Sequence, residues 1–460
     1  MQYYSLKKQS ALVDFKTAAI TGQAPDKGLY FPTHIPSLDA ATIQRFKTLP
    51  KEQLAFEVMR PYVGGAIDDK SLQQICKETI AFDFPSVSIT DQIDSLELFH
   101  GPTLAFKDVG ARFMSRCLGY FAKQNLLEQS NHQINDAKKT TVLVATSGDT
   151  GGAVANGFLG VEGVSVIILY PKGKVSPIQE LQLTTCGQNI TALEVDGSFD
   201  DCQAIVKEAF MDVALNEKYN LTSANSINVA RWLPQQLYYF FAWQDWVAKY
   251  GEEVTMNVVV PSGNFGNICA GMMAKASGLP IGQFVAACNA NDVVTRYLST
   301  QKYEVKKAVA TISNAMDVGN PSNFVRILEI LENNFPALTK ALSSYSIDDT
   351  ITKATIARVY KTNNYTLDPH GAVAFAAAEI YLANLEKANT SSNAQYNTNS
   401  YSAIILETAH PVKFPEVVEE AIGQTIAIPD SVKFLLDKKK ISTPLAANYA
   451  AFKNWMIAAS

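Results

Sequence analysis

The chain has 460 residues, of which 47% are hydrophobic and 18% are charged, and its formal net charge at pH 7 is −5. A chain of this length exceeds one hydrophobic core and predicts two or three domains. The modest negative charge, without a basic tail, argues against nucleic acid as a partner, and the lack of a long apolar run argues against a membrane-spanning helix.

Residues 1 to about 90 combine short helical patterns with irregular turns marked by proline and glycine. One such turn runs through Ala24-Pro25-Asp26-Lys27-Gly28. We interpret residues 1–90 as an N-terminal domain and residues 91–460 as the region that follows it.

A single lysine, Lys107, follows the largely apolar segment 98–106. Burial among apolar neighbours disfavours the ammonium form, so the neutral amine becomes available for Schiff-base chemistry with a carbonyl cofactor. The alternative is a lysine that extends its charge to solvent from the edge of a core helix. Taken alone the segment favours that alternative, but two loops further along the chain favour the chemical interpretation.

From residue 139 onward, short β-branched runs alternate with helical patterns. This alternation predicts parallel strands buried on both faces, with ligands beyond their carboxyl ends. The polar loops after Ala145, Val260 and Leu406 are therefore the candidate binding loops. Strands are expected at Thr141–Ala145, Val164–Tyr170, Ile190–Val195, Asn257–Val260, Phe284–Ala287 and Ala403–Leu406, with helices at 176–186 and 200–216.

The loop Thr146-Ser147-Gly148-Asp149-Thr150-Gly151-Gly152 joins a strand to a helix and is rich in hydroxyl groups. Hydroxyl and backbone N–H groups at the start of a helix suit a carboxylate or a phosphate. In a purely structural interpretation, Ser147, Asp149 or Thr150 caps the helix, and the two interpretations are compatible.

A second loop, Pro261-Ser262-Gly263-Asn264-Phe265-Gly266-Asn267, has the same setting, with a helix expected from about Ile268. Its glycines allow successive N–H groups to face an anion. No lysine completes a nucleotide-triphosphate motif, so a compact phosphate monoester fits better. An ordinary strand-to-helix turn is the alternative.

Thr408 and His410 follow the last expected strand. A hydroxyl there could meet the ring nitrogen of a bound heterocycle or could stabilise a turn, and the sequence leaves the two open. His410 could act as a base, although a packed, hydrogen-bonded histidine is the commoner outcome. We expect an exposed loop at residues 389–400 and a solvated surface turn at Lys438–Lys440.

The cysteines and histidines lack the spacing of a disulfide framework or a metal site. No CxxC pair and no HExxH motif occurs. We therefore expect reduced thiols in a cytoplasmic enzyme without a metal. The N-terminus has no apolar segment typical of a signal peptide, which fits this location. The cysteines are Cys76, Cys117, Cys186, Cys202, Cys269 and Cys288.

Taken together, the motifs resemble those of the threonine synthase family, which are pyridoxal-phosphate enzymes of fold type II, the tryptophan-synthase-β-like fold. The resemblance extends over nearly the full chain and corresponds to the longer branch, which has an N-terminal domain. The matching segments are 26–32, 99–108, 145–151, 223–228, 261–267, 314–317, 321–323 and 408–411.

The resemblance implies an α/β fold of two parallel-sheet lobes with the active site between them, in residues 91–460. It also implies that Lys107 forms a Schiff base with pyridoxal 5'-phosphate and acts as the catalytic residue. Asp149 stands where many relatives place an asparagine near the 3-oxygen of the cofactor. The remaining implied contacts are Gly263, Asn264, Phe265, Gly266 and Asn267 with the cofactor phosphate, Thr408 with the pyridine nitrogen, and Thr146, Ser147, Gly148 and Thr150 with the substrate carboxylate.

The implied activity is a carbon–oxygen lyase that acts on phosphates. It converts O-phospho-L-homoserine and water into L-threonine and phosphate, the last step of threonine biosynthesis. A serine or threonine dehydratase of the same fold and a non-catalytic phospholigand-binding relative are the alternatives. We expect a monomer or homodimer whose partner is a small-molecule substrate, with no nucleic acid and no membrane.

Overall fold

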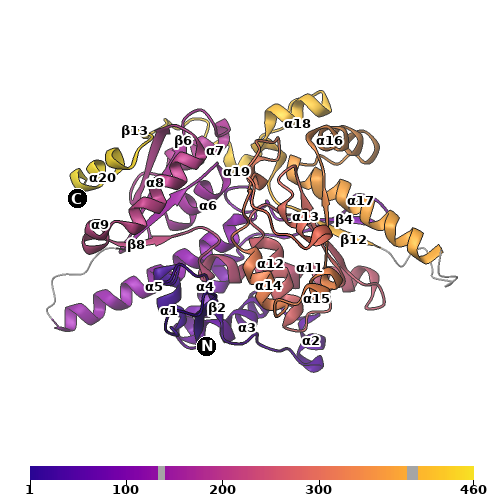
Figure 1. The fold of residues 1–460 in the computed structure, drawn as a ribbon, viewed down its shortest axis with the longest axis horizontal. Helices are drawn as coiled ribbons and strands as arrows, with labels where there is room; N and C mark the ends of the chain where they lie inside the picture. Colours follow the sequence, from indigo (N-terminus) through magenta and orange to yellow (C-terminus); the bar gives the residue numbers. More distant parts are fainter. Residues whose placement is uncertain (133–139, 391–401, 460) are drawn as a thin grey trace.

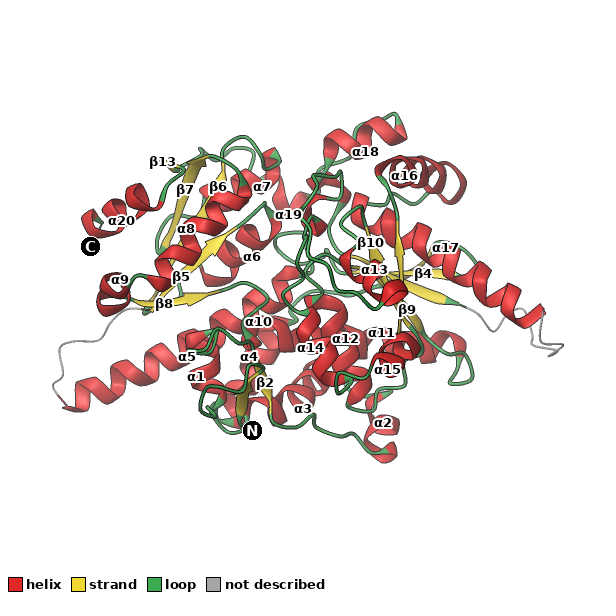
Figure 2. Ribbon diagram, viewed as in Figure 1, coloured by secondary structure: helices red, strands yellow, loops and turns green. Residues whose placement is uncertain are grey.

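The computed structural model describes residues 1–132, 140–390 and 402–459. These residues form two α/β lobes side by side, with the N-terminal elements packed below the junction in the view of Figure 1. Each lobe contains one largely parallel sheet with helices around it (Figure 2). The two parallel-sheet lobes predicted from the sequence are therefore present.

The first lobe is built on a five-stranded parallel sheet with the order β13-β7-β6-β5-β8. Its strands are β5 (Thr140–Ala145), β6 (Val164–Pro171), β7 (Ile190–Asp196), β8 (Asn220–Ser223) and β13 (Thr443–Ala446). The helices around it are α6 (Asp149–Phe158), α7 (Pro177–Thr184), α8 (Phe199–Met211), α9 (Val213–Lys218), α19 (Asp430–Lys433) and α20 (Tyr449–Ala458).

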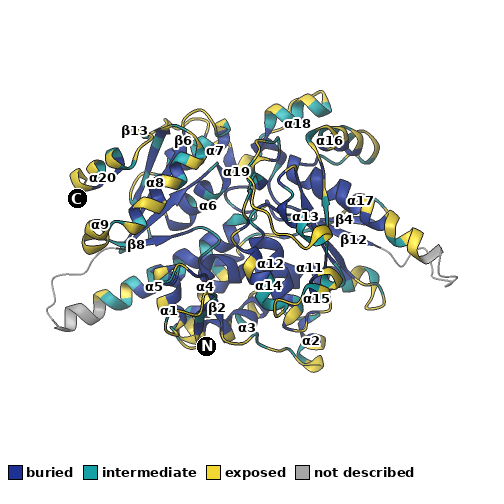
Figure 3. Ribbon diagram, in the orientation of Figure 1, coloured by how far each residue is buried: buried dark blue, intermediate teal, exposed yellow. Residues whose placement is uncertain are grey.

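Alternate side chains of this sheet enter two different cores, as the pleat of a β-strand requires. Val142 and Val144 belong to the core that includes α6, whereas Leu143 and Ala145 belong to the core that includes α8 and α20. Both faces are therefore buried, which explains why the strands are almost continuously apolar. Figure 3 shows the same contrast between buried strands and the exposed outer sides of the helices.

The second lobe contains a six-stranded sheet with the order β11-β10-β9-β12-β4-β3, in which only β3 is antiparallel to its neighbour. Its strands are β3 (Ser86–Ser88), β4 (Ile93–Glu97), β9 (Asn257–Pro261), β10 (Phe284–Cys288), β11 (Leu342–Ser346) and β12 (Ala403–Glu407). The accompanying helices are α11 (Leu237–Tyr250), α12 (Gly266–Ala276), α13 (Val293–Thr300), α14 (Phe324–Ile330), α15 (Phe335–Ala341), α16 (Asp349–Asn363), α17 (Pro369–Thr390) and α18 (Pro415–Ile422).

The sheet of the second lobe is also buried on both faces. Val259 and Ile405 pack in a core with α16 and α17, whereas Val258, Val260 and Leu406 pack in the core that includes α11 and α12. The carboxyl ends of β4, β9 and β12 consequently lie next to one another at one edge of the sheet.

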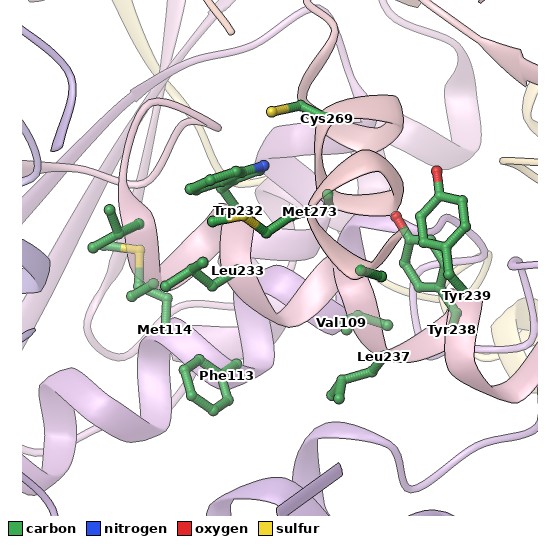
Figure 4. Close-up of a cluster of buried hydrophobic side chains, with 14 of the residues drawn as sticks. Val109, Phe113, Met114, Trp232, Leu233, Leu237, Tyr238, Tyr239, Cys269 and Met273 are labelled. Atoms are coloured by element: carbon green, nitrogen blue, oxygen red, sulfur yellow. The ribbon is translucent and has the colours of Figure 1, made fainter. Parts of the chain in front are cut away.

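Residues N-terminal to β3 form a small antiparallel sheet and four helices. They share one hydrophobic core with the central helices, because Tyr3 and Phe15 belong to the cluster that contains Val109 of α5 and Trp232 of α10. Figure 4 shows the centre of this cluster, between α5, α10, α11 and α12. The N-terminal elements are β1 (Tyr3–Ser5), β2 (Tyr30–Pro32), α1 (Phe15–Thr21), α2 (Ala40–Phe46), α3 (Lys51–Val63) and α4 (Asp69–Thr79). The central helices α5 and α10 span Lys107–His132 and Val229–Trp232.

The predicted division into domains 1–90 and 91–460 stays a prediction. The structure adds that β3, on the N-terminal side of this boundary, pairs with β4 in the sheet of the second lobe.

Three predicted boundaries are wrong. The expected helix 200–216 is two helices, because Asp212 ends α8 and its carboxylate accepts the Leu215 N–H to begin α9. The helix expected from Ile268 begins at Gly266. The expected loop at 389–400 starts too early, since α17 continues to Thr390, and its remainder lies outside the described residues.

The described helices include none that is both long enough and apolar enough to cross a membrane. All six cysteines are free thiols, and five of them are buried. The lysines at 438–440 are exposed as expected, although Lys440 also forms ion pairs with Glu180 and Glu194.

Candidate active site

Three loops leave the same edge of the six-stranded sheet: the predicted loops after Val260 and Leu406, and the segment before Lys107, which follows a strand that the sequence analysis did not predict. They follow β4, β9 and β12, which are neighbouring parallel strands. The loop after β5 leaves the carboxyl end of the other sheet. It approaches the three loops of the six-stranded sheet through Asp149, whose Oδ2 lies 3.9 Å from Lys107 Nζ. Ligands of open α/β sheets bind at such strand ends.

The main chain around Lys107 is held against the end of β12. The Phe106 N–H donates to the Thr408 carbonyl at 2.9 Å, and the His410 N–H donates to the Leu104 carbonyl at 3.0 Å. These bonds place Lys107, the first residue of α5, beside Thr408. The structure therefore brings together two predicted site residues that are 301 positions apart in sequence.

Lys107 occupies a largely apolar and partly enclosed position. Its side chain is 16% exposed, and Nζ lies 5.7 Å from the centre of the Phe106 ring. Burial lowers the pKa of Lys107 from its ordinary value, and the cations Lys413 and Arg231 lower it further, whereas Asp149 opposes them. The lowered pKa makes the neutral amine more accessible to a carbonyl group, as the sequence led us to expect.

Asp149 is buried and ionised. Its Oδ1 lies 2.7 Å from Lys413 Nζ and accepts a hydrogen bond from Gln179 Nε2 at 2.8 Å. Burial alone would raise the pKa of this carboxyl, but Lys413 and Lys107 outweigh burial and hold the pKa well below its usual range. The negative charge of Asp149 is therefore compensated within the protein.

The loop after β5 is organised by Thr146 rather than by a capping side chain at the helix start. Thr146 Oγ1 accepts the N–H groups of Gly148 at 3.0 Å and Gly151 at 2.8 Å. The interpretation of Ser147, Asp149 or Thr150 as the cap is wrong, because Gly148 is the N-cap residue and the Gly151 N–H in the first turn bonds Thr146 Oγ1 instead. Ser147 and Thr150 are half-buried.

The loop after β9 enters α12 through Phe265, which has a left-handed backbone with φ of 58° and serves as the N-cap. Asn264 Nδ2 donates to Ser226 Oγ at 2.8 Å, and Asn264 Oδ1 accepts the Ser322 N–H at 2.6 Å. These bonds fix the orientation of the Asn264 side chain within the protein.

Gly263 needs to be a glycine because the chain passes close behind it. A Cβ at Gly263 would lie 2.5 Å from Met316 Cα, a distance that no side chain tolerates. The segment that contains Met316 is the short 3-10 helix η2 (Asn314–Met316). The second glycine of the loop, Gly266, is roomier, with 3.2 Å to the Ser226 Cβ.

Asn267 has an unused donor at the start of α12. Its Oδ1 accepts hydrogen bonds from the hydroxyl groups of Tyr238 and Tyr239, both at 2.7 Å, whereas its buried Nδ2 has no partner among the described residues. The two tyrosines stand on the same side of α11 in Figure 4. An unpaired donor at a helix N-terminus suits an anion, so this loop together with the Lys107 amine fits an aldehyde that carries a phosphate.

His410 adopts the packed state. Its Nδ1 accepts the Val412 N–H at 3.1 Å, its ring packs edge-on against Phe99, and burial lowers the pKa of His410 to about 4. The neutral imidazole is a weak base whose acceptor atom is already used. Thr408 is 7% exposed beside it.

A buried network behind Thr408 was not expected. Burial and the charge of Asp368 raise the pKa of Glu407 well above its ordinary value, which favours the protonated carboxyl. Glu407 Oε1 accepts the Asp368 N–H at 2.6 Å, and the second carboxyl oxygens of both residues are buried. Asp368 Oδ1 in turn lies 2.5 Å from His370 Nδ1, and His370 Nε2 accepts the Ala315 N–H at 3.2 Å.

Sequence reasoning missed Lys413, Gln179, Arg231 and the Glu407 network. Lys413 carried the same signal as Lys107, a lysine beside apolar residues, and could have been found on that ground. Arg231, whose Nη1 donates to the Lys107 carbonyl at 3.0 Å, and Gln179 show no comparable local signal.

Comparisons with known proteins cover the whole of this architecture. Three family models match: Threonine synthase N terminus at residues 2–80, Pyridoxal-phosphate dependent enzyme at 96–392, and Threonine synthase, C-terminal at 372–456. The threonine synthase of Escherichia coli strain K12 is 39% identical over 459 residues, which is 99% of each chain.

Solved structures agree with these matches. The crystal structure of threonine synthase from yeast has a TM-score of 0.87 at 35% identity and covers 100% of this chain and 99% of its own. The pyridoxal-phosphate-bound threonine synthase from Brucella melitensis has a TM-score of 0.87 at 32% identity and covers 99% of this chain and 98% of its own.

These matches confirm the two-lobed fold with its N-terminal region, pyridoxal phosphate as cofactor, and the threonine-forming lyase activity. They favour that activity over the dehydratase and the non-catalytic alternative. The chain belongs to the threonine synthase family of pyridoxal-phosphate-dependent enzymes.

Proposed function

We propose that the chain converts O-phospho-L-homoserine and water into L-threonine and phosphate, with Lys107 as the catalytic residue. One observation supports this assignment above the others. The Lys107 amine is only 16% exposed and faces Asp149 Oδ2 at 3.9 Å, where the loops after both sheets meet. Its lowered pKa suits a group that must both give and take protons near neutral pH.

The residues that would hold the cofactor come from four loops, those after β4, β5, β9 and β12. Lys107 would bond its aldehyde, the turn from Gly263 to Asn267 would hold its phosphate at the start of α12, Thr408 would face its ring nitrogen, and Asp149 would lie near its 3-oxygen. When bound, pyridoxal phosphate supplies an electron sink for negative charge at the substrate carbons.

Lys107 would carry the protons of the reaction. Its amine would take a proton from Cα and then one from Cβ of the substrate, while the bond between Cγ and the phosphate oxygen breaks. It would return protons to Cγ and Cα, and water would add its hydroxyl group at Cβ while its remaining proton goes to the departed phosphate. The products then balance as L-threonine and inorganic phosphate.

The loop after β5 would hold the substrate carboxylate. The half-buried Ser147 and Thr150 are the favoured donors. Thr146 Oγ1 already accepts two backbone N–H groups, including that of Gly148, and retains its own hydroxyl proton for donation. Gly148 would shape the turn rather than donate to the ligand.

The test is the release of phosphate from O-phospho-L-homoserine, with L-threonine measured in the same sample. The Lys107→Ala variant should lose about 10²–10⁴-fold in rate or more, as expected when the proton-transfer group is removed. A Lys453→Met variant, which removes a surface lysine paired with Asp212, is the matched control and should keep the wild-type rate. Deamination of serine or threonine in place of phosphate release would instead identify a dehydratase.

We also propose that the enzyme works in the cytoplasm as a monomer or homodimer. The six free thiols support a reducing compartment.

A further inference from the structure

Lys413 is a fully buried cation next to the proposed catalytic lysine. Its side chain is 0% exposed, and Nζ lies 2.7 Å from Asp149 Oδ1 and donates to the Thr103 carbonyl at 2.7 Å. A buried ammonium is unfavourable unless an anion and further hydrogen bonds compensate it. Packing alone therefore does not explain why the charged side chain of Lys413 occupies this buried position.

Asp149 lies at different distances from the two lysines next to it. Oδ1 contacts both Lys413 and Gln179 Nε2, at 2.7 Å and 2.8 Å, whereas Oδ2 lies 3.9 Å from Lys107 Nζ, beyond hydrogen-bond reach. The carboxylate is thus directed towards Lys413 and held there by Gln179.

We propose that Lys413 is a positioning residue that binds the Asp149 carboxylate as its own ion-pair partner and so leaves Lys107 without a full counter-ion. This inference rests on the proposed role of Lys107. Without Lys413, Asp149 would have Lys107 as its nearest cation, and the pair would hold the Lys107 nitrogen in its protonated form. With Lys413 in place, the two charges cancel beside Lys107, and its nitrogen can release a proton.

Other ionisable groups also lie near Lys107. They are Arg231 on α10, which bonds the Lys107 carbonyl, Asp368 ahead of α17, and the buried Asp108 in the first turn of α5. Asp108 is engaged by the N–H and hydroxyl groups of Thr103. Removal of Lys413 does not leave the Thr103 carbonyl unpaired, because Gln182 Nε2 also donates to it at 3.1 Å.

The test compares Lys413→Met, Asp149→Asn and the double variant with the wild type. The measurement is the pH at which the visible absorption band of the purified holoenzyme changes, which reports the proton on the Lys107 nitrogen without any turnover. Lys413→Met should move this midpoint upward by about one pH unit, a tenfold change in the ionisation constant. Asp149→Asn should move it downward, and the double variant should return close to the wild-type midpoint.

Lys453→Met, which removes an ion-paired lysine outside the site, should leave the midpoint unchanged. If Lys413→Met folds and its midpoint equals that of the wild type, the inference is wrong. If that variant fails to fold, the other two decide: a downward shift in Asp149→Asn that the double variant reverses supports the inference, and an unshifted Asp149→Asn overturns it.

Threonine formation, measured on the same preparations, separates this inference from the proposed function. The expected shifts without any threonine would retract the proposed function and leave the role of Lys413 standing. Threonine formation with unshifted midpoints would retract the role of Lys413 and leave the proposed function standing.

Discussion

Two buried carboxyl groups near the site take opposite protonation states because their neighbours differ. Asp149 faces the cations Lys413 and Lys107, and its pKa is held well below the usual range. Glu407 faces the anion Asp368, and its pKa is raised well above the usual range. Burial disfavours ionisation at both positions, so the sign of the nearest charge decides the outcome.

The protonated state of Glu407 predicts how stability depends on pH. Its pKa is raised above the ordinary 4.5, so its contribution to stability is full below that pH and is lost progressively as the pH rises towards the pKa of the folded state. Glu407→Gln keeps the shape and the donor to Asp368 but cannot ionise. The free energy of unfolding of the variant relative to wild type should therefore rise between pH 5 and 8, by at most about 1.4 kcal/mol per pH unit.

Urea denaturation of both proteins across this pH range provides the measurement. A difference between the two proteins that stays constant with pH would show that Glu407 is ionised in the folded state.

At the scale of elements, the site is made by strand ends whose loops are tied together by backbone bonds. The segment before α5 is joined to the end of β12 through Phe106 and Thr408, and the turn after β9 rests on η2 through Gly263 and Met316. In the same η2 segment, the Ala315 N–H donates to His370 Nε2. The turn after β9 and the end of β12 are therefore connected through η2, His370 and Asp368.

The two glycines of this turn should respond differently to substitution. Gly263→Ala would place a methyl group 2.5 Å from Met316 Cα and displace either η2 or the turn, whereas Gly266→Ala meets side-chain atoms at 3.2 Å. We expect Gly263→Ala to weaken pyridoxal-phosphate binding by about tenfold or more, equal to ~1.4 kcal/mol, and Gly266→Ala to have a smaller effect. Cofactor dissociation measured by dialysis and absorbance checks this order, and equal affinities in the two variants would contradict it.

The sequence predicted β5, β6, β7, β9, β10 and β12 and the loops after β5, β9 and β12 because their signals are local, and it missed β3, β4, β8, β11 and β13 of the two large sheets. Runs such as Val142 to Ala145 are short, apolar and partly β-branched, which favours buried strands, and glycine-containing turns follow the runs that end at Ala145 and Val260. The site geometry depends instead on contacts between distant positions, such as Lys413 with Thr103, which are 310 residues apart. The break at Asp212 was a local signal, a helix-capping residue, that the periodic pattern on both sides concealed.

At the scale of the molecule, the N-terminal elements and the central helices share one hydrophobic core. Arg326 of α14 joins them: it is fully buried and donates to the carbonyl groups of Tyr30 in β2 and of Ser226 and Ile227, of which Ser226 contacts Asn264 in the turn after β9. Arg326 thereby links β2 of the N-terminal region to residues next to the candidate active site.

Arg326→Met should destabilise the whole protein by about 3 kcal/mol or more, because three buried carbonyl groups lose a charged donor. Arg358→Met, which removes an exposed ion pair with Glu379, should cost less than about 1 kcal/mol. Denaturant unfolding with one transition is expected for both variants. A small effect of Arg326→Met on the free energy of unfolding, or the separate unfolding of an N-terminal unit, would contradict this prediction. Either result would show that the contacts between the N-terminal elements and the central helices contribute little to stability.

The central claim is that Lys107, rather than Lys413, bonds the cofactor, although both lysines contact or approach Asp149 within 4 Å. The most direct measurement is reduction of the holoenzyme with borohydride, followed by digestion and mass spectrometry of the labelled peptide. The account predicts a single adduct on Lys107. An adduct on Lys413, or on any other lysine, would contradict it.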